Sequence, residues 1–140
     1  MKIIAADVGG TKTRLVVAET DRPGEVLYEA RYNSGDFDAF EPLLKTFIEE
    51  SGSDIRRLAA LSLAFPGVVN GAEARLTNLP WTISKEALQD KFGVEQIHFM
   101  NDFQASALGT AHLMAQDLVC LNPGVHNNEA TRVAVGAGTG

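Results

Sequence analysis

The hydrophobic pattern at the start of the chain predicts three antiparallel strands. A nearly all-apolar run at residues 2–7 is followed, after a short turn, by a second apolar run at residues 14–19. Residues 25–32 then alternate apolar and polar side chains, with Leu27 as the exception. Continuous apolar runs are typical of strands covered on both faces, whereas alternation is typical of a half-exposed strand. We therefore expect a buried strand, its hairpin partner and a half-exposed outer strand.

A helix is predicted at residues 36–51, because apolar side chains recur there at helical spacing. Pro42 is tolerated only in the first turn of a helix, so the regular helix is expected to begin near Phe40. Gly52 is expected to end it. The apolar residues that we expect to form a stripe in the core are Phe37, Phe40, Leu43, Leu44, Phe47 and Ile48.

The rest of the chain predicts alternating strands and helices, and therefore an α/β fold. The Asn70-Gly71 pair is a tight-turn signal, and Ser84 is a suitable N-cap for a short helix. In order, we expect a strand at 58–65, a short hairpin at 68–77, a helix at 85–92, a strand at 94–100, an alanine-rich helix at 103–115 and strands at 117–121 and 132–135.

The end of the sequence bears on domain organisation. The 140 residues, 45% of them hydrophobic, are enough for one domain with its own core. A new hairpin is nevertheless predicted after Ala115, and the sequence stops in a glycine-rich run. A strand and a turn with nothing after them do not complete a fold. We therefore expect an N-terminal domain at residues 1–115 and the truncated start of a second domain at residues 116–140, in the front part of a longer protein.

Charge and cysteine content argue against some classes of protein. The net charge is −6 and no basic stripe is present, which argues against nucleic acid as a partner. No apolar stretch approaches the roughly 20 residues of a membrane span, so no membrane association is expected. The single cysteine, Cys120, excludes an internal disulfide and suits a reducing cytoplasm. Its apolar neighbours predict a small buried side chain.

The stretch between the first two strands carries the strongest chemical signal. Gly9 and Gly10 are adjacent, and glycine reaches positive φ without a Cβ clash, so the pair predicts a tight hairpin turn. A turn without a ligand is the commoner use of such a pair. The flanking Asp7 and Thr11-Lys12-Thr13 favour phosphate binding instead. Backbone N–H groups and a hydroxyl would bind the phosphate, Lys12 would add positive charge, and Asp7 would hold Mg²⁺ directly or through water.

A second glycine-rich run, at residues 136–140, follows the last predicted strand. Its Gly-x-Gly-x-Gly pattern is a weak dinucleotide signal, because the helix that should follow is missing. A second phosphate-binding hairpin turn explains it better, since both glycine-rich turns then follow a strand.

Asn101 and Asp102 follow the strand predicted at residues 94–100. Asn and Asp are favoured helix N-caps, which is one explanation of the pair. The other explanation is positional, because open α/β sheets bind ligands at the carboxyl ends of their strands. An Asp there can take a proton from a hydroxyl that attacks a phosphorus. Both explanations hold together if Asn101 caps the helix and Asp102 acts as the base.

Four motifs resemble those of the bacterial glucokinase family, in the same order and at similar spacing. The resemblance extends over the whole chain, and four motifs in register are far more specific than one. They are Asp7-Val8-Gly9-Gly10-Thr11, Thr77-Asn78-Leu79-Pro80-Trp81, Asn101-Asp102-Phe103 and Gly136-Ala137-Gly138-Thr139-Gly140.

The resemblance implies the ribonuclease-H-like (actin-like ATPase) fold, an α/β fold with two domains around a cleft. The implied N-terminal domain has a mixed sheet with three antiparallel strands at its start and helices on both faces. The implied reaction is transfer of the γ-phosphoryl group of ATP to the 6-hydroxyl of glucose, the first step of glycolysis. ATP and Mg²⁺ are the implied cofactors, and glucose or a related hexose is the implied partner. The full-length protein is implied to be a cytoplasmic homodimer.

The resemblance also implies roles for individual residues. Asp102 is the implied general base, and Asp7 is implied to serve the Mg²⁺. The implied sugar-binding residues are Asn101, Asp102, Gly67, Thr77, Asn78 and Gly138. The implied phosphate-binding residues are Ala6, Asp7, Val8, Gly9, Gly10, Thr11 and Lys12 in the first turn, and Gly138 and Thr139 in the second.

Two features depart from the family pattern. Lys12 stands where glucokinases of this type usually have Asn and where the related ROK (repressor, open reading frame, kinase) sugar kinases have Lys. The residues that complete the sugar site in the family, and the adenine pocket, are expected beyond Gly140. We therefore expect the 140 residues by themselves to have little or no kinase activity.

Three alternatives remain open at this point. The first is a ROK-type kinase for another hexose, such as mannose, or for an N-acetylhexosamine. The second is a non-catalytic sugar-sensing regulator, which would usually carry a DNA-binding segment before the first strand; here that strand is predicted from Lys2. The third is a structural member of the actin-like class, which would not need Asn101-Asp102 beside a sugar loop.

Overall fold

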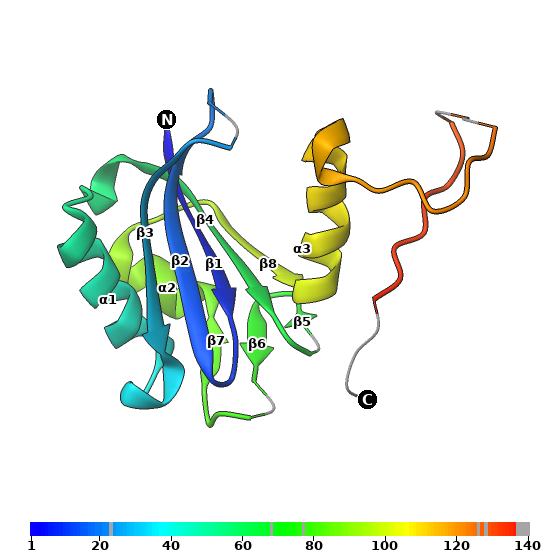
Figure 1. The fold of residues 1–140 in the computed structure, drawn as a ribbon. Coiled ribbons are helices and arrows are strands. Elements are labelled where there is room, and N and C mark those ends of the chain that lie inside the picture. Colours follow the sequence, from blue (N-terminus) through cyan, green and yellow to red (C-terminus); the bar gives the residue numbers. More distant parts are fainter. Residues whose placement is uncertain (23, 68, 77, 126, 128, 137–140) are drawn as a thin grey trace. The chain divides into compact units, whose positions relative to one another are not determined.

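The computed structural model contains the three antiparallel strands predicted at the start of the chain (Figure 1). Strand β1 (Lys2–Val8) pairs with β2 (Lys12–Glu19), and β2 pairs with β3 (Val26–Asn33). Half-buried and exposed side chains alternate along most of β3, which is the half-exposed outer strand that the pattern predicts. The structure describes residues 1–22, 24–67, 69–76, 78–125, 127 and 129–136.

Two further strands turn this meander into a mixed sheet. Strand β4 (Leu58–Phe65) runs parallel to β1, and β8 (Ile97–Asn101) runs parallel to β4. The strand order is β3-β2-β1-β4-β8, which confirms the predicted mixed α/β sheet with an antiparallel start. Because β1, β4 and β8 run in one direction, their carboxyl ends meet at one edge of the sheet.

The chain divides into two units, residues 1–105 and residues 106–140, and each is described by itself. The domain boundary predicted after residue 115 stays a prediction. In the first unit, the helices α1 (Phe40–Ser51) and α2 (Lys85–Phe92) occupy their predicted positions. Gly52 ends α1 in the left-handed conformation, and the Ser84 hydroxyl accepts a hydrogen bond from the Ala87 N–H group at the start of α2.

A small second sheet lies between β4 and α2 in the sequence. It consists of β5 (Val69–Asn70), β6 (Glu73–Arg75) and β7 (Thr82–Ser84), in that order. The turn between β5 and β6 confirms the Asn-Gly hairpin prediction. Strand β7 was not predicted, because three residues are too few for an alternating pattern to stand out.

One face of the large sheet forms the core of the first unit. Helix α1 lies beside this face in Figure 1, and the apolar side chains of α1 and α2 are buried against those of the strands. Removal of these side chains from water is the main favourable contribution to folding. The fully buried large side chains include Ile4, Val8, Leu15, Phe40, Leu43, Leu44, Phe47, Leu61, Leu63, Phe65, Ile83 and Leu88.

On the opposite face of the sheet, several residues of β1 and β4 have small side chains. Ala5, Ser62 and Ala64 line a shallow depression there together with Met100. Ala105, in the first turn of α3 (Asp102–Gly109), lines the same depression. The first unit therefore has helical residues on both sides of its sheet, as predicted.

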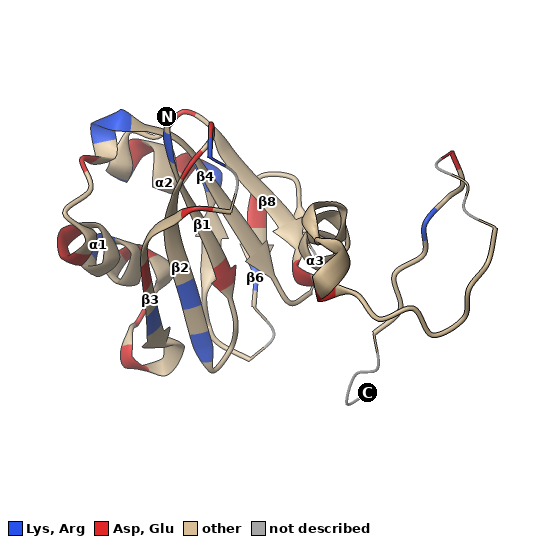
Figure 2. Cartoon of the chain, turned by 45° about the horizontal axis from the view of Figure 1, so that its top comes forward, with Lys and Arg blue, Asp and Glu red and all other residues tan. Residues whose placement is uncertain are grey.

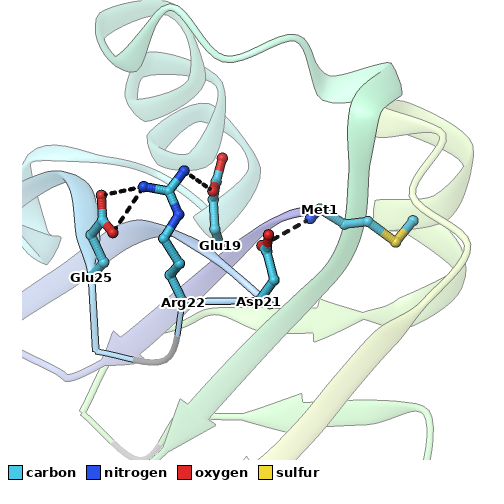
Figure 3. A network of polar contacts seen from close by, with 5 residues as sticks. All are labelled: Met1, Glu19, Asp21, Arg22 and Glu25. Carbon is cyan, nitrogen blue, oxygen red and sulfur yellow. Dashed lines mark hydrogen bonds and ion pairs between the residues drawn. The ribbon is translucent and has the colours of Figure 1, made fainter.

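Ion pairs close the end of the sheet that lies away from the turn between β1 and β2 (Figure 3). The Arg22 guanidinium contacts Glu19 at 2.8 Å and Glu25 at 3.0 Å, and the terminal amino group contacts Asp21 at 3.5 Å. All of these groups are at least partly exposed, so each pair contributes little to stability. Figure 2 shows Lys and Arg residues scattered among Asp and Glu residues over the described parts of the chain.

A side-chain hydrogen bond joins the outer strand to the first helix. The Tyr32 hydroxyl donates to the Glu50 carboxylate. Burial, and then this hydrogen bond, raises the pKa of Tyr32 well above its ordinary value. Since folding favours the neutral phenol, its contribution to stability is complete below the unfolded-state pKa of about 10 and is lost as pH rises through the folded-state pKa.

We therefore expect a pH-dependent effect of Tyr32→Phe on the full-length protein. At pH 8 the variant should be less stable by about 1 kcal/mol, because Glu50 loses its donor. The difference in free energy of unfolding between the variant and the wild type should narrow above pH 10. In that range unfolding of the wild type releases the Tyr32 proton and so becomes more favourable, whereas the variant has no such proton. Urea unfolding at the two pH values checks this expectation, and a difference that stays constant would contradict it.

In the second unit, the two strands predicted at residues 117–121 and 132–135 are absent. The described residues there form short 3₁₀ turns, at Thr110–His112 and Ala115–Asp117, and irregular chain. A strand needs a neighbour for its backbone hydrogen bonds, and these described segments do not pair with one another. Cys120 is consequently exposed, and the prediction that it is buried is wrong.

The helix predicted at residues 103–115 is also shorter than expected. Helix α3 ends at Gly109, and a 3₁₀ turn continues to His112. Glycine is a poor helix former, which accounts for the early end. Within the described residues, no helix is long and apolar enough to cross a membrane.

Candidate phosphate and sugar site

The turn between β1 and β2 presents backbone donors that are not bonded to any residue that the structure describes. Gly9 N–H donates to the Lys12 carbonyl at 3.1 Å, and Ser34 N–H donates to the Thr11 carbonyl at 2.9 Å. The N–H groups of Gly10 and Thr11 have no hydrogen-bond partner among the described residues. Adjacent backbone N–H groups at an exposed turn are suited to binding an anion. The geometry of the turn therefore fits the predicted phosphate site.

Crowding, and not positive φ, requires glycine at both positions of this turn. Neither Gly9 nor Gly10 is among the described glycines with positive φ. A Cβ atom at Gly9 would lie 2.6 Å from the Lys12 carbonyl oxygen, and one at Gly10 would lie 2.8 Å from Cβ of Asn78. The predicted reason for the two glycines is thus wrong, because the space that a side chain needs is already occupied.

The segment at residues 76–81 is anchored beside the turn. Leu76 N–H donates to the Trp81 carbonyl at 3.3 Å, which closes the segment on itself. Trp81 is buried, and its Nε1–H group donates to the Phe37 carbonyl at 3.2 Å. Its ring also packs against Phe40, with the ring centroids 6.4 Å apart. This anchor helps to hold the segment that carries Asn78 against the turn, whereas Thr77 lies outside the described residues.

Asn101 is held at both ends of its side chain. Its Nδ2 group donates to the Gly67 carbonyl at 3.1 Å. Its Oδ1 atom accepts from Phe103 N–H at 2.9 Å and from Gln104 N–H at 3.2 Å. The N-cap explanation of Asn101 is therefore confirmed. The same side chain also brings the loop after β4, in which Gly67 has a φ of 118°, to the start of α3.

Asp102 is the first residue of α3 and is half-buried. Its Oδ1 atom accepts a hydrogen bond from Phe103 N–H at 2.7 Å, so the start of the helix fixes the orientation of the carboxylate. The carboxylate therefore takes part in capping together with Asn101. The sequence suggested that Asn101 caps the helix and Asp102 acts only as the base, but in the structure both side chains cap the helix.

The sheet brings the predicted site residues to one edge. Asp7 is opposite Ala64, and Ala64 is opposite Met100, which directly precedes Asn101. Since neighbouring strands lie about 4.8 Å apart, the ends of β1 and β8 are separated by roughly 10 Å. Asp7, Gly67, Asn101 and Asp102, far apart in the sequence, thus lie at the carboxyl edge of the parallel strands. Ala6 and Val8 instead point into the core.

Charge near the turn leaves Asp7 suited to a cation. Asp7 is exposed, and its cross-strand neighbour Arg14 makes two hydrogen bonds of 2.8 Å to Glu29. The hydrogen bond from Arg14 holds the pKa of Glu29 below its usual range, and Glu29 raises the pKa of Arg14. Arg14 is therefore engaged mainly by Glu29. Lys12, also exposed, provides the positive charge beside the turn.

The donor set is also relevant to the predicted Mg²⁺. The described residues contain no group of three or more His, Cys, Asp or Glu side chains arranged for a metal ion. Mg²⁺ bound with a nucleotide usually takes only one or two carboxylates, with phosphate oxygens and water as its other ligands. The single exposed carboxylate of Asp7 beside the turn fits that use. The second predicted phosphate turn, with Gly138 and Thr139, lies outside the described residues.

Two residues beside the turn, one in β2 and one directly after β3, have roles that the sequence did not reveal. Thr13 was grouped with the phosphate-binding residues, but its side chain is fully buried. Ser34 was not singled out, although its hydroxyl donates to the Gly9 carbonyl at 2.7 Å. A serine between a strand and a helix is common, so no local signal marks it.

Comparison with known proteins identifies the family. The sequence model of the Glucokinase family matches residues 4–140. The chain belongs to the glucokinase family. The glucokinase of Nostoc punctiforme is 38% identical over 140 residues, which are 99% of this chain and 40% of that protein. The chain thus spans about 40% of the length of the curated glucokinases that it matches.

Solved structures agree at the level of the fold. A glucokinase from an Antarctic psychrotroph superposes with a TM-score of 0.79 at 23% identity, over 91% of this chain and 40% of that one. A ROK family glucokinase from Streptomyces griseus, in complex with glucose and AMPPNP, gives a TM-score of 0.57 at 20% identity, over 78% of this chain and 36% of that one. These likenesses confirm the actin-like ATPase fold of the glucokinase family.

Proposed function

We propose that the full-length protein is a glucokinase, which transfers the γ-phosphoryl group of ATP to the 6-hydroxyl of glucose. The observation that carries the proposal is the edge of the sheet where Asp7, the Asn101-Asp102 pair and N–H donors without a partner among the described residues lie together. Phosphoryl transfer asks a protein mainly to position the reactants and to stabilise charge. Membership of the glucokinase family is consistent with each of these roles.

On the phosphate side, the turn between β1 and β2 is proposed to bind phosphate oxygens of ATP. The N–H groups of Gly10 and Thr11 are the proposed donors, and Lys12 adds a positive charge. Asp7 would hold the Mg²⁺, which supplies charge neutralisation when it is bound. Gly138 and Thr139 are proposed to form the second phosphate turn, by resemblance alone.

On the sugar side, Asp102 is the proposed general base. As the 6-hydroxyl attacks the γ-phosphorus, its proton moves to the Asp102 carboxylate. The new phosphorus–oxygen bond forms to the sugar, the bond to the bridging oxygen of ATP breaks, and ADP leaves. Asn101, itself fixed by Gly67 and the start of α3, is proposed to hydrogen-bond the sugar. Gly67, Thr77, Asn78 and Gly138 are proposed to contribute further sugar contacts.

Lys12 gives weight to one alternative, a ROK-type kinase for another hexose or for an N-acetylhexosamine. The 38% identity to a glucokinase over the whole chain favours glucose. A ROK family glucokinase from Streptomyces griseus has been solved in complex with glucose and AMPPNP, so a likeness to ROK kinases does not argue against glucose as the substrate. We further propose a cytoplasmic protein that is a homodimer at full length, with no nucleic acid or membrane as partner.

A substrate panel tests the proposal. ADP formation by the full-length protein with Mg²⁺ and ATP should be highest, as kcat/KM, with glucose, and lower with mannose and with N-acetylglucosamine or N-acetylmannosamine. The reverse order would favour the ROK-type alternative, and no sugar-dependent ADP formation would favour a regulator. The 140 residues alone should show little or no turnover in the same assay.

A further inference from the structure

Thr13 and Ser34 are the only fully buried polar side chains among the residues that the structure describes. Their hydroxyl oxygens are 3.0 Å apart, and the Ser34 hydroxyl is 2.7 Å from the Gly9 carbonyl oxygen. No buried side-chain polar atom of the described residues lacks a partner. Burial of two hydroxyl groups is unfavourable unless both are hydrogen-bonded, so this cluster has a defined arrangement.

Proton counting fixes the direction of both hydrogen bonds. A hydroxyl group has one proton to donate, and a carbonyl oxygen only accepts. The Ser34 proton must therefore point to the Gly9 carbonyl. Thr13 must in turn donate to the Ser34 oxygen. The result is a one-way relay from Thr13 through Ser34 to Gly9.

The relay ends on the peptide unit that carries the first unpaired donor of the turn. The Gly9 carbonyl and the Gly10 N–H belong to one trans peptide, so they point in opposite directions. A carbonyl held toward buried Ser34 therefore turns the Gly10 N–H away from the core. Ser34 also holds the peptide between Thr11 and Lys12, through its N–H bond of 2.9 Å to the Thr11 carbonyl. One residue thus clamps two of the three peptide units within the turn.

We propose that Ser34 is a positioning residue for ATP and that Thr13 supports it. By fixing the Gly9 carbonyl, the two hydroxyls hold the Gly10 N–H in the direction in which it donates to a phosphate oxygen. This inference rests on the proposed function, because it deepens the role of the phosphate turn. It assigns the control of the turn to side chains that themselves touch no substrate.

The test is Ser34→Ala in the full-length protein. The KM for ATP and the Kd of a non-hydrolysable ATP analogue should both rise about tenfold, since the Gly9 peptide is then free to rotate. The KM for glucose should stay within twofold. Thr13→Val should raise the KM for ATP much less, because the Ser34 hydroxyl loses its donor Thr13 but still donates to the Gly9 carbonyl.

Two controls separate positioning from general destabilisation. Ser51→Ala removes a hydroxyl that donates to a backbone carbonyl at the end of α1, far from the turn in sequence, and should leave all kinetic constants unchanged. Ser34→Cys keeps a weak donor of similar size, so its KM for ATP should lie between those of the wild type and Ser34→Ala. This variant gives a readout if Ser34→Ala fails to fold.

The outcomes distinguish this inference from the proposed function. If the wild type phosphorylates glucose and Ser34→Ala or Ser34→Cys leaves ATP binding unchanged, the positioning role is wrong and the function stands. If Thr13→Val weakens ATP binding as much as Ser34→Ala, the two hydroxyls have a structural role, and the hydrogen bond from Ser34 to Gly9 does not explain the weaker binding. If the wild type neither binds nor uses ATP, the proposed function itself fails.

Discussion

Replacement of Asp102 by Asn in the full-length protein is expected to lower kcat by about 10²–10⁴-fold, the usual contribution of a positioned base. The KM for glucose should change little. The Asn side chain retains an oxygen that can accept the hydrogen bond from Phe103 N–H, so the start of α3 should survive. It cannot take a proton from the sugar hydroxyl, and this difference isolates the chemistry from the fold.

A matched control for this variant is Asp90→Asn. Asp90 is an exposed carboxylate on α2, in the same unit of the chain, and its loss changes the net charge by the same amount. The kcat of Asp90→Asn should equal that of the wild type. If Asp102→Asn retains more than half of the wild-type kcat, Asp102 is not the base and the sugar hydroxyl loses its proton elsewhere.

Alanine at Gly9 or at Gly10 is expected to destabilise the full-length protein by about 1–3 kcal/mol, as overpacking usually does. The two variants should differ in whether they can be rescued. The Cβ atom at position 9 meets a backbone oxygen at 2.6 Å, and no side-chain change removes that obstacle. The Cβ atom at position 10 meets the Cβ atom of Asn78 at 2.8 Å, and this obstacle can be removed.

A double-mutant cycle measures the rescue. The loss in free energy of unfolding, measured with urea, should be smaller for Gly10→Ala combined with Asn78→Gly than the sum of the losses for the two single variants, because the clash is gone. Gly10→Ala combined with Asn78→Ala is the control, since alanine keeps the Cβ atom that causes the clash. Equal rescue by both changes at position 78, or none by either, would show that the contact between turn and loop is not as described.

Elements with a strong local pattern were predictable from the sequence. The bounds of β4 agree to the residue with the apolar run at 58–65, and those of α2 agree with its Ser84 cap and Gly93 end. Strand β7 and the two absent strands of the second unit were not predictable in this way. The three residues of β7 are too few to show a hydrophobic period. In the second unit, an apolar run would become a strand only if another strand paired with it.

The site was predictable as a set of motifs but not as an arrangement. Local sequence marks Asp7 and Asp102, because acids at strand ends are chemically conspicuous. It does not show that Asn78 fills the space beside Gly10 or that Asn101 donates to Gly67, since these contacts depend on the strand order. Ser34 was missed for the same reason, because its importance lies in a carbonyl that precedes it by 25 residues.

We propose that this edge of the sheet belongs to a hexose kinase that uses ATP. The most direct test of this proposal is the product formed by the full-length protein from ATP, Mg²⁺ and glucose, identified by phosphorus NMR alongside the rate of ADP formation. We expect glucose 6-phosphate, formed in a one-to-one ratio with ADP and only when glucose is present. ADP formation that does not depend on a sugar, or a phosphoryl group on another hydroxyl, would contradict it.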